Sequence, residues 1–320
     1  MEGPNKSQKT FQESFFRCLL LSSASMLLFC AGSFAPPLGT TAFLFSPTPL
    51  ALLGARENKD WMAAGLLGAA LILGLVFGPW VFVYFLLDEG FLCFGLTIPL
   101  GKTKNGGESL VFCTLISVLS KVFFVTLNVG LGRPHPLMVD PGALRVFLTR
   151  MHSSAVGPSG REATLLYESV EQAVRFIPYM LPSLILLSSI LDSFLNYRLC
   201  ETLQRRRAEM LFPALPSFGE WRFPKSLLWG LACSFLLPLF TGEGGWVLWP
   251  MLEVNLKFLV LVFFFLQGMS LVWWWLSRRA AHFLLRVLVV ALLVALGPWV
   301  AALGVGDLCF NFRARKIKKM

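Results

Sequence analysis

The sequence predicts an all-α protein, a polytopic transmembrane helical bundle of eight or nine spans. Of its 320 residues 56% are hydrophobic and only 14% are charged, whereas about a quarter of the residues in soluble domains are charged. The apolar residues form repeated runs of about 20 residues, the length that a helix needs to cross a bilayer. The basic residues lie in short segments beside these runs, as the positive-inside rule requires. The net charge of +10 is therefore attributed to membrane topology and not to nucleic-acid binding.

The first half of the chain is expected to form five of these spans. Residues 1–17 are a polar, cytoplasmic N-terminal segment, and an uncleaved membrane helix begins at Cys18. The stretch 38–53 contains Pro47 and Pro49, which lack the backbone donor, so we expect this span to be bent or re-entrant. The next three spans are residues 61–77, 80–99 and 109–130.

The second half opens with the longest polar region, residues 131–173. Its amphipathic stretches are expected to lie outside the cell, against the membrane surface. The sixth span, residues 175–197, leads into a basic loop, residues 198–225, which the positive-inside rule places in the cytoplasm. A cytoplasmic basic patch in this loop consists of Arg205, Arg206 and Arg207. The C-terminal spans, residues 226–312, begin with spans at 226–240 and within 246–276.

The last apolar run, residues 283–305, allows two topologies. A single crossing would place the basic tail, residues 313–320, outside the cell, against the positive-inside rule. Gly297-Pro298 interrupts the run, so we expect a break there, a run that folds back, and a cytoplasmic tail.

No motif in the sequence points to an enzyme, a cofactor or a metal site. The seven cysteines form no C-x-x-C pair, so we expect buried thiols rather than metal ligands or disulfides. The string Gly157–Gly160 matches the G-x-S-G of rhomboid proteases, but it lies in the long polar region, where a turn is expected. Because no nucleophile and base are paired, we expect no catalytic residues.

Polar residues inside the spans are the candidate binding site. A charge at the middle of a bilayer costs about 3 kcal/mol on insertion scales, and it normally faces a partner or a water-filled cavity. Asp88 and Glu89 lie near the middle of one span and Lys121 near the middle of the next, so we expect one of the acids to pair with Lys121 or to share a cavity with it. The candidate cavity-lining residues are Asp88, Glu89, Lys121, Asn128, Asp192, Asn196, Glu253, Lys257 and Gln267. Two interpretations stay open: structural ion pairs and interhelical hydrogen bonds, or a polar cavity for a solute or an ion.

Short motifs rich in proline, glycine and aromatic residues run through most of the chain. They are Pro36…Pro47-x-Pro49…Gly54, Pro178-x-x-x-Pro182 through Asn196-Tyr197, Pro216-x-Phe218-x-x-Trp221-Arg222-x-Pro224, and Gly304-x-Gly306-Asp307-x-x-Phe310-Asn311-Phe312-Arg313. These motifs resemble the YybS-like family of bacterial membrane proteins, although aspartate would be expected in place of Asn311. The resemblance implies a multi-pass protein of the bacterial cytoplasmic membrane.

The first six spans of such proteins, residues 18–197 here, are similar to the S components of energy-coupling-factor vitamin transporters. S components bind a small solute and dock on a coupling subunit, commonly through an A-x-x-x-A face on the first helix. Here the middle of that helix reads SSAS at Ser22–Ser25, and the A-x-x-x-A pair, Ala31 and Ala35, lies at its outer end.

The expected function is therefore a non-enzymatic, transporter-like membrane protein that binds a small solute. Its expected partners are the lipid bilayer, the solute and another membrane subunit. The alternative is a structural or regulatory protein of the cell envelope that acts through its basic cytoplasmic loop.

Overall fold

Every regular element in the described part of the chain is a helix. The computed structural model describes residues 6–34, 38–103, 105–132, 146, 160–205, 211–240, 248–279 and 282–313. Within these ranges six helices are long and apolar enough to cross a membrane, or seven if a bent pair near the C-terminus counts as one span. The predicted all-α membrane bundle is thus confirmed, with fewer full-length spans than the eight or nine expected.

The chain divides into two compact units, which are described separately. Unit 1 comprises Met1–Pro136 and Ile185–Leu215, and unit 2 comprises Leu137–Leu184 and Pro216–Met320. Helix α9 contributes its C-terminal part to unit 1 and its N-terminal part to unit 2.

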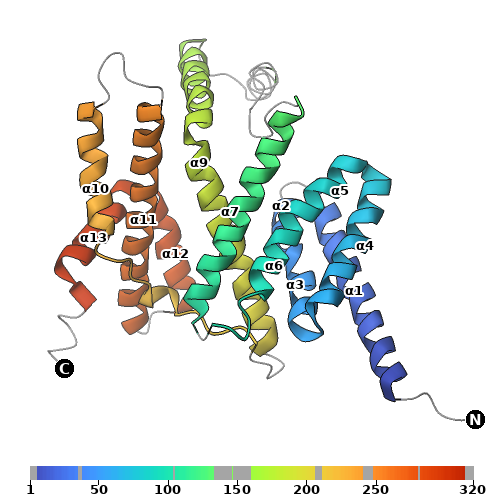
Figure 1. The fold of residues 1–320 in the computed structure, drawn as a ribbon. Helices are drawn as coiled ribbons and strands as arrows, with labels where there is room; N and C mark the ends of the chain where they lie inside the picture. Colours follow the sequence, from blue (N-terminus) through green and yellow to red (C-terminus); the bar gives the residue numbers. More distant parts are fainter. Residues whose placement is uncertain are drawn as a thin grey trace, which may run out of the picture. The chain divides into compact units, whose positions relative to one another are not determined.

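Unit 1 contains the helices that the first half of the sequence predicts (Figure 1). They are α1 (Lys6–Phe34), α2 (Leu38–Leu44), α3 (Pro47–Arg56), α4 (Lys59–Phe77), α5 (Pro79–Phe85), the π-helical turn η1 (Leu86–Gly90), α6 (Phe91–Thr97), α7 (Gly106–Gly130) and the C-terminal part of α9 (Gly160–Arg205). Helices α5 and α6 and the turn η1 make one candidate span, Pro79–Thr97. The stretch predicted to be bent or re-entrant forms the short pair α2 and α3, and neither helix is long enough to be a candidate span.

Local sequence signals set several of these helix ends. Asn58 caps α4, because its Oδ1 accepts a hydrogen bond from the amide of Trp61 at 2.8 Å. Asn105 caps α7 through the amide of Gly107 at 2.9 Å. Gly78 adopts a positive φ of 102°, which a glycine tolerates, and Pro79 then starts α5. These caps supply partners for amides that a helix start leaves unpaired.

The apolar core of unit 1 forms where α1, α3, α4 and the span Pro79–Thr97 meet. It includes the fully buried side chains of Leu50, Leu53, Met62 and Phe85. Many other apolar side chains on these helices are exposed, as expected for surfaces that face lipid.

Unit 2 contains the N-terminal part of α9, the 3₁₀ turns η2 (Phe218–Glu220) and η3 (Leu237–Phe240), and the helices α10 (Leu227–Leu236), α11 (Leu248–Arg278), α12 (Phe283–Val294) and α13 (Gly297–Phe310). The span predicted at 226–240 is thus a shorter apolar helix that ends in a 3₁₀ turn. The C-terminal amphipathic stretch of the polar region, residues 163–174, lies in the beginning of α9. Most of the polar region lies outside the described residues.

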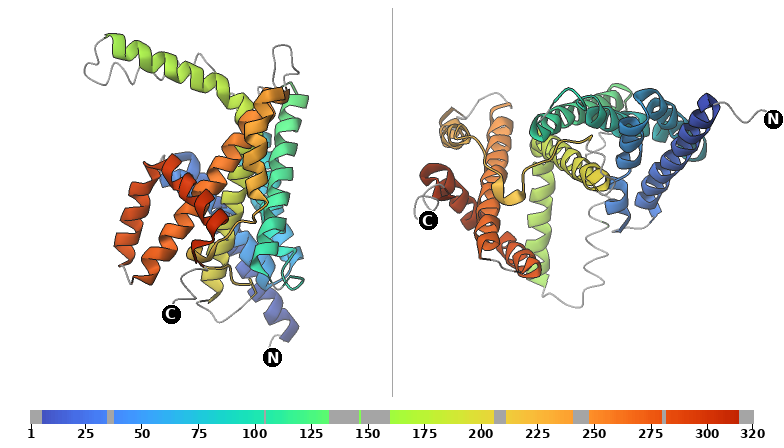
Figure 2. Two further views of the ribbon diagram at one scale, coloured as in Figure 1. Left: turned by 90° about the vertical axis from the view of Figure 1, so that its left-hand side faces the viewer. Right: turned by 90° about the horizontal axis from the view of Figure 1, so that it is seen from below.

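The break predicted in the last apolar run is present (Figure 2). Helix α12 ends at Val294, and α13 starts at Gly297 with Pro298 in its first turn, at an angle of 107° to α12. Proline suits the first turn of a helix, because its missing amide would be unpaired there. Residues 314–320 lie outside the described residues, so the cytoplasmic position of the tail stays a prediction.

Two glycines let α11 and α13 touch backbone to backbone. A Cβ atom added to Gly268 would lie 2.0 Å from the carbonyl oxygen of Val300, and one added to Gly304 would lie 2.0 Å from that of Phe264. No side chain fits at such distances, so the glycines fix the contact between these two helices.

Candidate functional site

The candidate site is a cluster of polar side chains within the membrane helices of unit 1. Its members are Asp88 and Glu89 on η1, Lys121 on α7, and Asp192 and Asn196 on α9. Two of them, Glu89 and Asn196, contact the break between α2 and α3.

The break between α2 and α3 exposes backbone carbonyls that need donors, because lipid supplies none. Pro47 cannot donate to the carbonyl of Phe43, and the Ser46 amide and hydroxyl contact that oxygen instead, at 3.0 and 2.6 Å. The hydroxyl of Ser25 on α1 donates to the carbonyl of Ser46 at 2.6 Å. The broken helix is thus held by polar side chains of its neighbours.

Asn196 is the main side chain that joins α9 to this break. Its Nδ2 donates to the carbonyls of Leu44 and Asp192, each at 2.9 Å, and its Oδ1 accepts from the hydroxyl of Thr48 at 2.7 Å. The side chain is fully buried. Asn196 was predicted to line a cavity, and its amide is already occupied by these protein groups.

The π-helical turn η1 places two adjacent carboxyl groups inside unit 1. Glu89 is 2% exposed, and Asp88 is partly buried and accepts a hydrogen bond from the hydroxyl of Tyr84 at 3.1 Å. The hydroxyl of Ser120 on α7 donates to the carbonyl of Leu87, within the turn, at 2.5 Å. Such π turns inside helices often occur at functional sites.

Lys121 forms its ion pair with Asp192, whereas the sequence predicted that Asp88 or Glu89 would pair with Lys121 or share a cavity with it. It also donates to the hydroxyl of Ser117, one turn earlier on α7, at 3.1 Å. The side chains of Lys121 and Asp192 are 20% and 19% exposed. Lys121 also interacts electrostatically with Asp88 and Glu89, and a cavity shared by these three residues stays a prediction.

The carboxyl group of Glu89 is only partly bonded. Its Oε1 contacts the hydroxyl of Ser46, whereas its Oε2 is buried and has no hydrogen-bond partner in the described part of the chain. The thiol of Cys93, one turn further along, donates to the carbonyl of Pro47 at 3.3 Å. Over the same residues no group of three or more His, Cys, Asp or Glu side chains is placed to hold a metal ion.

The other predicted cavity residues lie elsewhere. Asn128 bonds to the carbonyl of Phe124 in its own helix at 2.8 Å. Glu253 and Lys257 form an ion pair of 2.5 Å along α11, and Gln267 on the same helix donates to Asp307 at 2.6 Å. These α11 residues belong to unit 2, and their role in a cavity stays a prediction.

Sequence reasoning missed the role of Asn255 in unit 2. Pro178 and Pro182 lie inside α9, and proline disturbs the preceding turn of a helix. The amide of Asn255 on α11 bridges this turn, because its Nδ2 donates to the carbonyl of Tyr179 at 2.5 Å and its Oδ1 accepts from the amide of Ser183 at 2.8 Å. The sequence signal that could have indicated this role is the position of Asn255 within an apolar run.

Arg313 is the first residue of the predicted basic tail, residues 313–320, and the structure shows it to be buried. Its side chain is 1% exposed and lies 3.2 Å from the carboxylate of Asp307. It also donates to the carbonyls of Gly219 and Trp221 and to the hydroxyl of Ser270, at 2.6, 3.1 and 3.1 Å. The arginine thus fastens the end of α13 to the segment around η2.

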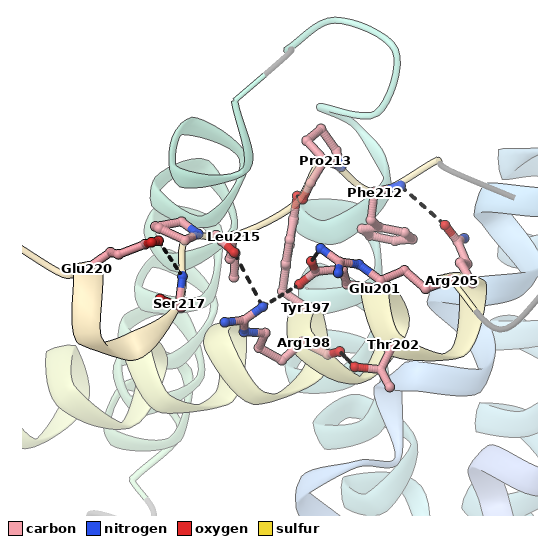
Figure 3. A network of polar contacts seen from close by, with 12 residues as sticks. Tyr197, Arg198, Glu201, Thr202, Arg205, Phe212, Pro213, Leu215, Ser217 and Glu220 are labelled. Carbon is pink, nitrogen blue, oxygen red and sulfur yellow. Dashed lines mark hydrogen bonds and ion pairs between the residues drawn. The ribbon is translucent and has the colours of Figure 1, made fainter. Parts of the chain in front are cut away.

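Residues 211–215, which follow α9, run back along that helix, and side chains of α9 bind their backbone (Figure 3). The hydroxyl of Tyr197 donates to the carbonyl of Pro213 at 2.8 Å, and Gln204 Oε1 accepts from the amides of Leu211 and Phe212 at 3.2 Å each.

The predicted basic patch is only partly described. Arg205 is paired with the buried carboxylate of Glu201 at 2.6 Å, and Arg198 binds the same group at 2.9 Å. Arg206 and Arg207 lie outside the described residues.

Comparison with known proteins identifies the family. Residues 23–308 match the family described as "Predicted membrane protein (DUF2232)", and the chain therefore belongs to this family. The chain is also 26% identical, over 298 residues, to "Uncharacterized protein YybS" of Bacillus subtilis (strain 168), with 89% of this chain and 92% of that protein covered. No solved structure matches the chain significantly. These matches confirm the YybS-like resemblance and a multi-pass membrane protein, while the similarity to S components stays a prediction.

Proposed function

We propose that this member of the DUF2232 family is a non-enzymatic, transporter-like protein of the bacterial cytoplasmic membrane that binds a small cationic solute at the polar cluster of unit 1. The observation that carries the proposal is an excess of carboxyl groups over ammonium groups among partly or fully buried side chains. Asp88, Glu89 and Asp192 share the cluster with one ammonium group, that of Lys121.

The charges of this cluster favour a positively charged solute. Lys121 is paired with Asp192, whereas Asp88 accepts a hydrogen bond from the neutral hydroxyl of Tyr84. A carboxylate inside a membrane is costly unless a cation or several donors compensate its charge. A cationic solute beside Asp88 would supply that compensation.

The aromatic side chains around Tyr84, which donates a hydrogen bond to Asp88, suit an organic ammonium group. The ring of Tyr84 stacks on that of Phe43 with centroids 6.2 Å apart, and the ring of Phe124 meets it edge-on at 5.0 Å. Phe29 lies 6.2 Å from Tyr84. Aromatic faces next to a carboxylate attract ammonium ions through cation–π interactions. The chemical class that fits the cluster is therefore a small amine or a quaternary ammonium compound.

The similarity to S components would add a coupling subunit that docks on α1. Two serines of the SSAS sequence are used inside unit 1, however. Ser25 donates to the carbonyl of Ser46, and Ser22 is 9% exposed and lies close to Gly65 on α4. Docking of a further subunit would therefore use another face of α1.

Native mass spectrometry and calorimetry of the protein in lipid nanodiscs would test the proposal. We expect a co-purifying cationic molecule, or binding of tetramethylammonium or choline, in the wild type. Asp88→Asn should weaken this binding at least about tenfold, which corresponds to about 1.4 kcal/mol. The matched control is Glu108→Gln, which removes an exposed carboxylate from the first turn of α7 and should leave binding unchanged.

Two results would contradict a solute-binding role. One is a wild type that carries no small molecule and binds neither probe. The other is equal binding by the wild type and Asp88→Asn. Either result would favour the alternative, a structural or regulatory envelope protein that acts through its basic loop.

A further inference from the structure

We propose that Glu89 is a proton-binding site, in which the carboxylic acid donates its hydrogen to Ser46 and holds the break between α2 and α3 against η1. This inference rests on the proposed function, because it assigns a bound proton to the same polar cluster. It rests in turn on the hydrogen atoms available at Ser46, on the burial of Glu89 and on the charges around it.

The hydroxyl of Ser46 has more acceptor contacts than hydrogens. Its Oγ lies 2.6 Å from the carbonyl of Phe43 and also contacts Glu89 Oε1. A serine hydroxyl carries one hydrogen, whereas a carbonyl and an ionised carboxylate are acceptors only. With Glu89 ionised, one of the two contacts would place two oxygen atoms together without a hydrogen. With a proton on Oε1, Glu89 donates to Ser46 and Ser46 donates to Phe43.

The second carboxyl oxygen agrees with this assignment. Oε2 is buried without a partner in the described part of the chain. A carbonyl oxygen left in this state costs about 1–3 kcal/mol, and a charged oxygen costs more. A proton on Oε1 makes Oε2 the carbonyl oxygen of a neutral acid, which is the cheaper of the two forms.

The charged and titratable groups near Glu89 do not neutralise it. They are Tyr84, Asp88, Cys93, Lys121 and Asp192. The one cation among them is Lys121, which is paired with Asp192. Two of the neighbours are further carboxyl groups, so a negative Glu89 would be repelled. A bound proton removes that repulsion.

The proton is thereby linked to the backbone at the break. Ser46 precedes α3, and its hydroxyl helps to satisfy the carbonyl that Pro47 leaves without its usual donor. Once Glu89 loses its proton, the single hydrogen of Ser46 can serve Phe43 or Glu89 but not both. Proton release therefore removes one of the two hydrogen bonds at Ser46, either the one within the break or the one that joins the break to η1.

Infrared spectroscopy of the full-length protein in nanodiscs in deuterated buffer at neutral pH tests this directly. The wild type should show the carbonyl-stretch band of a protonated carboxylic acid, and Glu89→Gln should lose it. Glutamine keeps the size and the neutral charge, so this variant should fold. Asp88→Asn, the matched control on the same turn, should retain the band.

Two hydroxyl variants locate the bond that the proton makes. Ser46→Ala removes the acceptor and should shift the band to higher frequency, because a weaker hydrogen bond stiffens the C=O bond. Thr48→Ala removes a neighbouring hydroxyl that donates to Asn196, and it should leave the frequency unchanged.

An absent band in the wild type, or a band that persists in Glu89→Gln, would overturn the proposal. An equal shift in Ser46→Ala and Thr48→Ala would overturn the assigned bond to Ser46. The measurement needs no solute, so the solute-binding role can fail in calorimetry while the proton site stands, and the reverse also holds.

Discussion

Replacing Asn196 by leucine should destabilise unit 1, because this side chain joins α9 to the broken helix. Leucine has a similar volume and would remove every polar contact of the amide. The carbonyl of Leu44 would lose the donor at 2.9 Å, and the hydroxyl of Thr48 would lose the acceptor at 2.7 Å. The carbonyl of Asp192 lies within α9, where the helix supplies a donor.

The expected loss is about 1–3 kcal/mol in the free energy of unfolding. An unsatisfied buried polar group costs about 1–3 kcal/mol, and two groups would double that cost. The hydroxyl of Thr48 can turn towards the carbonyl four residues earlier, that of Leu44, so the two lost partners can satisfy each other in part. Hydrogen bonds between membrane helices average about 0.6 kcal/mol in mutant cycles, which sets the lower end.

The assay is equilibrium unfolding of the purified protein in mixed micelles, with Asn128→Leu as the matched control. Asn128 is also a buried asparagine within a span, but its recorded bond is to Phe124 in its own helix. Its replacement should cost less than about 1 kcal/mol, because the carbonyl of Phe124 keeps its helical partner. Equal losses in the two variants would refute the bridging role of Asn196.

Two further predictions concern stability. Gly304→Ala should lower the melting temperature by the equivalent of about 1–3 kcal/mol, because its Cβ would lie 2.0 Å from the carbonyl oxygen of Phe264. The control is Gly297→Ala on the same helix, whose Cβ would meet nothing within 4 Å and which should not be destabilising. Similar melting temperatures for both variants would contradict the close contact of α11 and α13. The hydroxyl of Ser14 and a neighbouring arginine hold the pKa of Glu57 below its ordinary value, so the carboxylate contributes stability above its unfolded pKa of about 4.3 and loses it as the pH falls through the lowered folded value. Melting temperatures of the wild type and Glu57→Gln should therefore differ at neutral pH by the equivalent of about 1 kcal/mol and converge in acid, and a difference that does not change with pH would contradict this linkage.

The sequence alone determined the class of the protein and the places where its helices break. Apolar runs and prolines act locally, so α4, α7 and α11 lie close to where the runs predict them, and Gly297-Pro298 marks the boundary of α13. The same local signals overestimated the number of spans. Hydropathy measures how apolar a stretch is, and it does not show that residues 38–53 form two short helices.

The tertiary structure decided which polar groups meet. Lys121 could reach an acid on either neighbouring span. It pairs with Asp192 because α9 packs beside α7. The sequence places Arg313 at the start of a basic tail, whereas in the fold its side chain is buried against Asp307. Asn196 lies far along the chain from the break that it bridges, and Asn255 lies far from the proline-containing turn of α9 that it bridges. A residue type shows what a side chain can bond, but its partner depends on which helices pack together, and that follows from contacts between distant parts of the sequence.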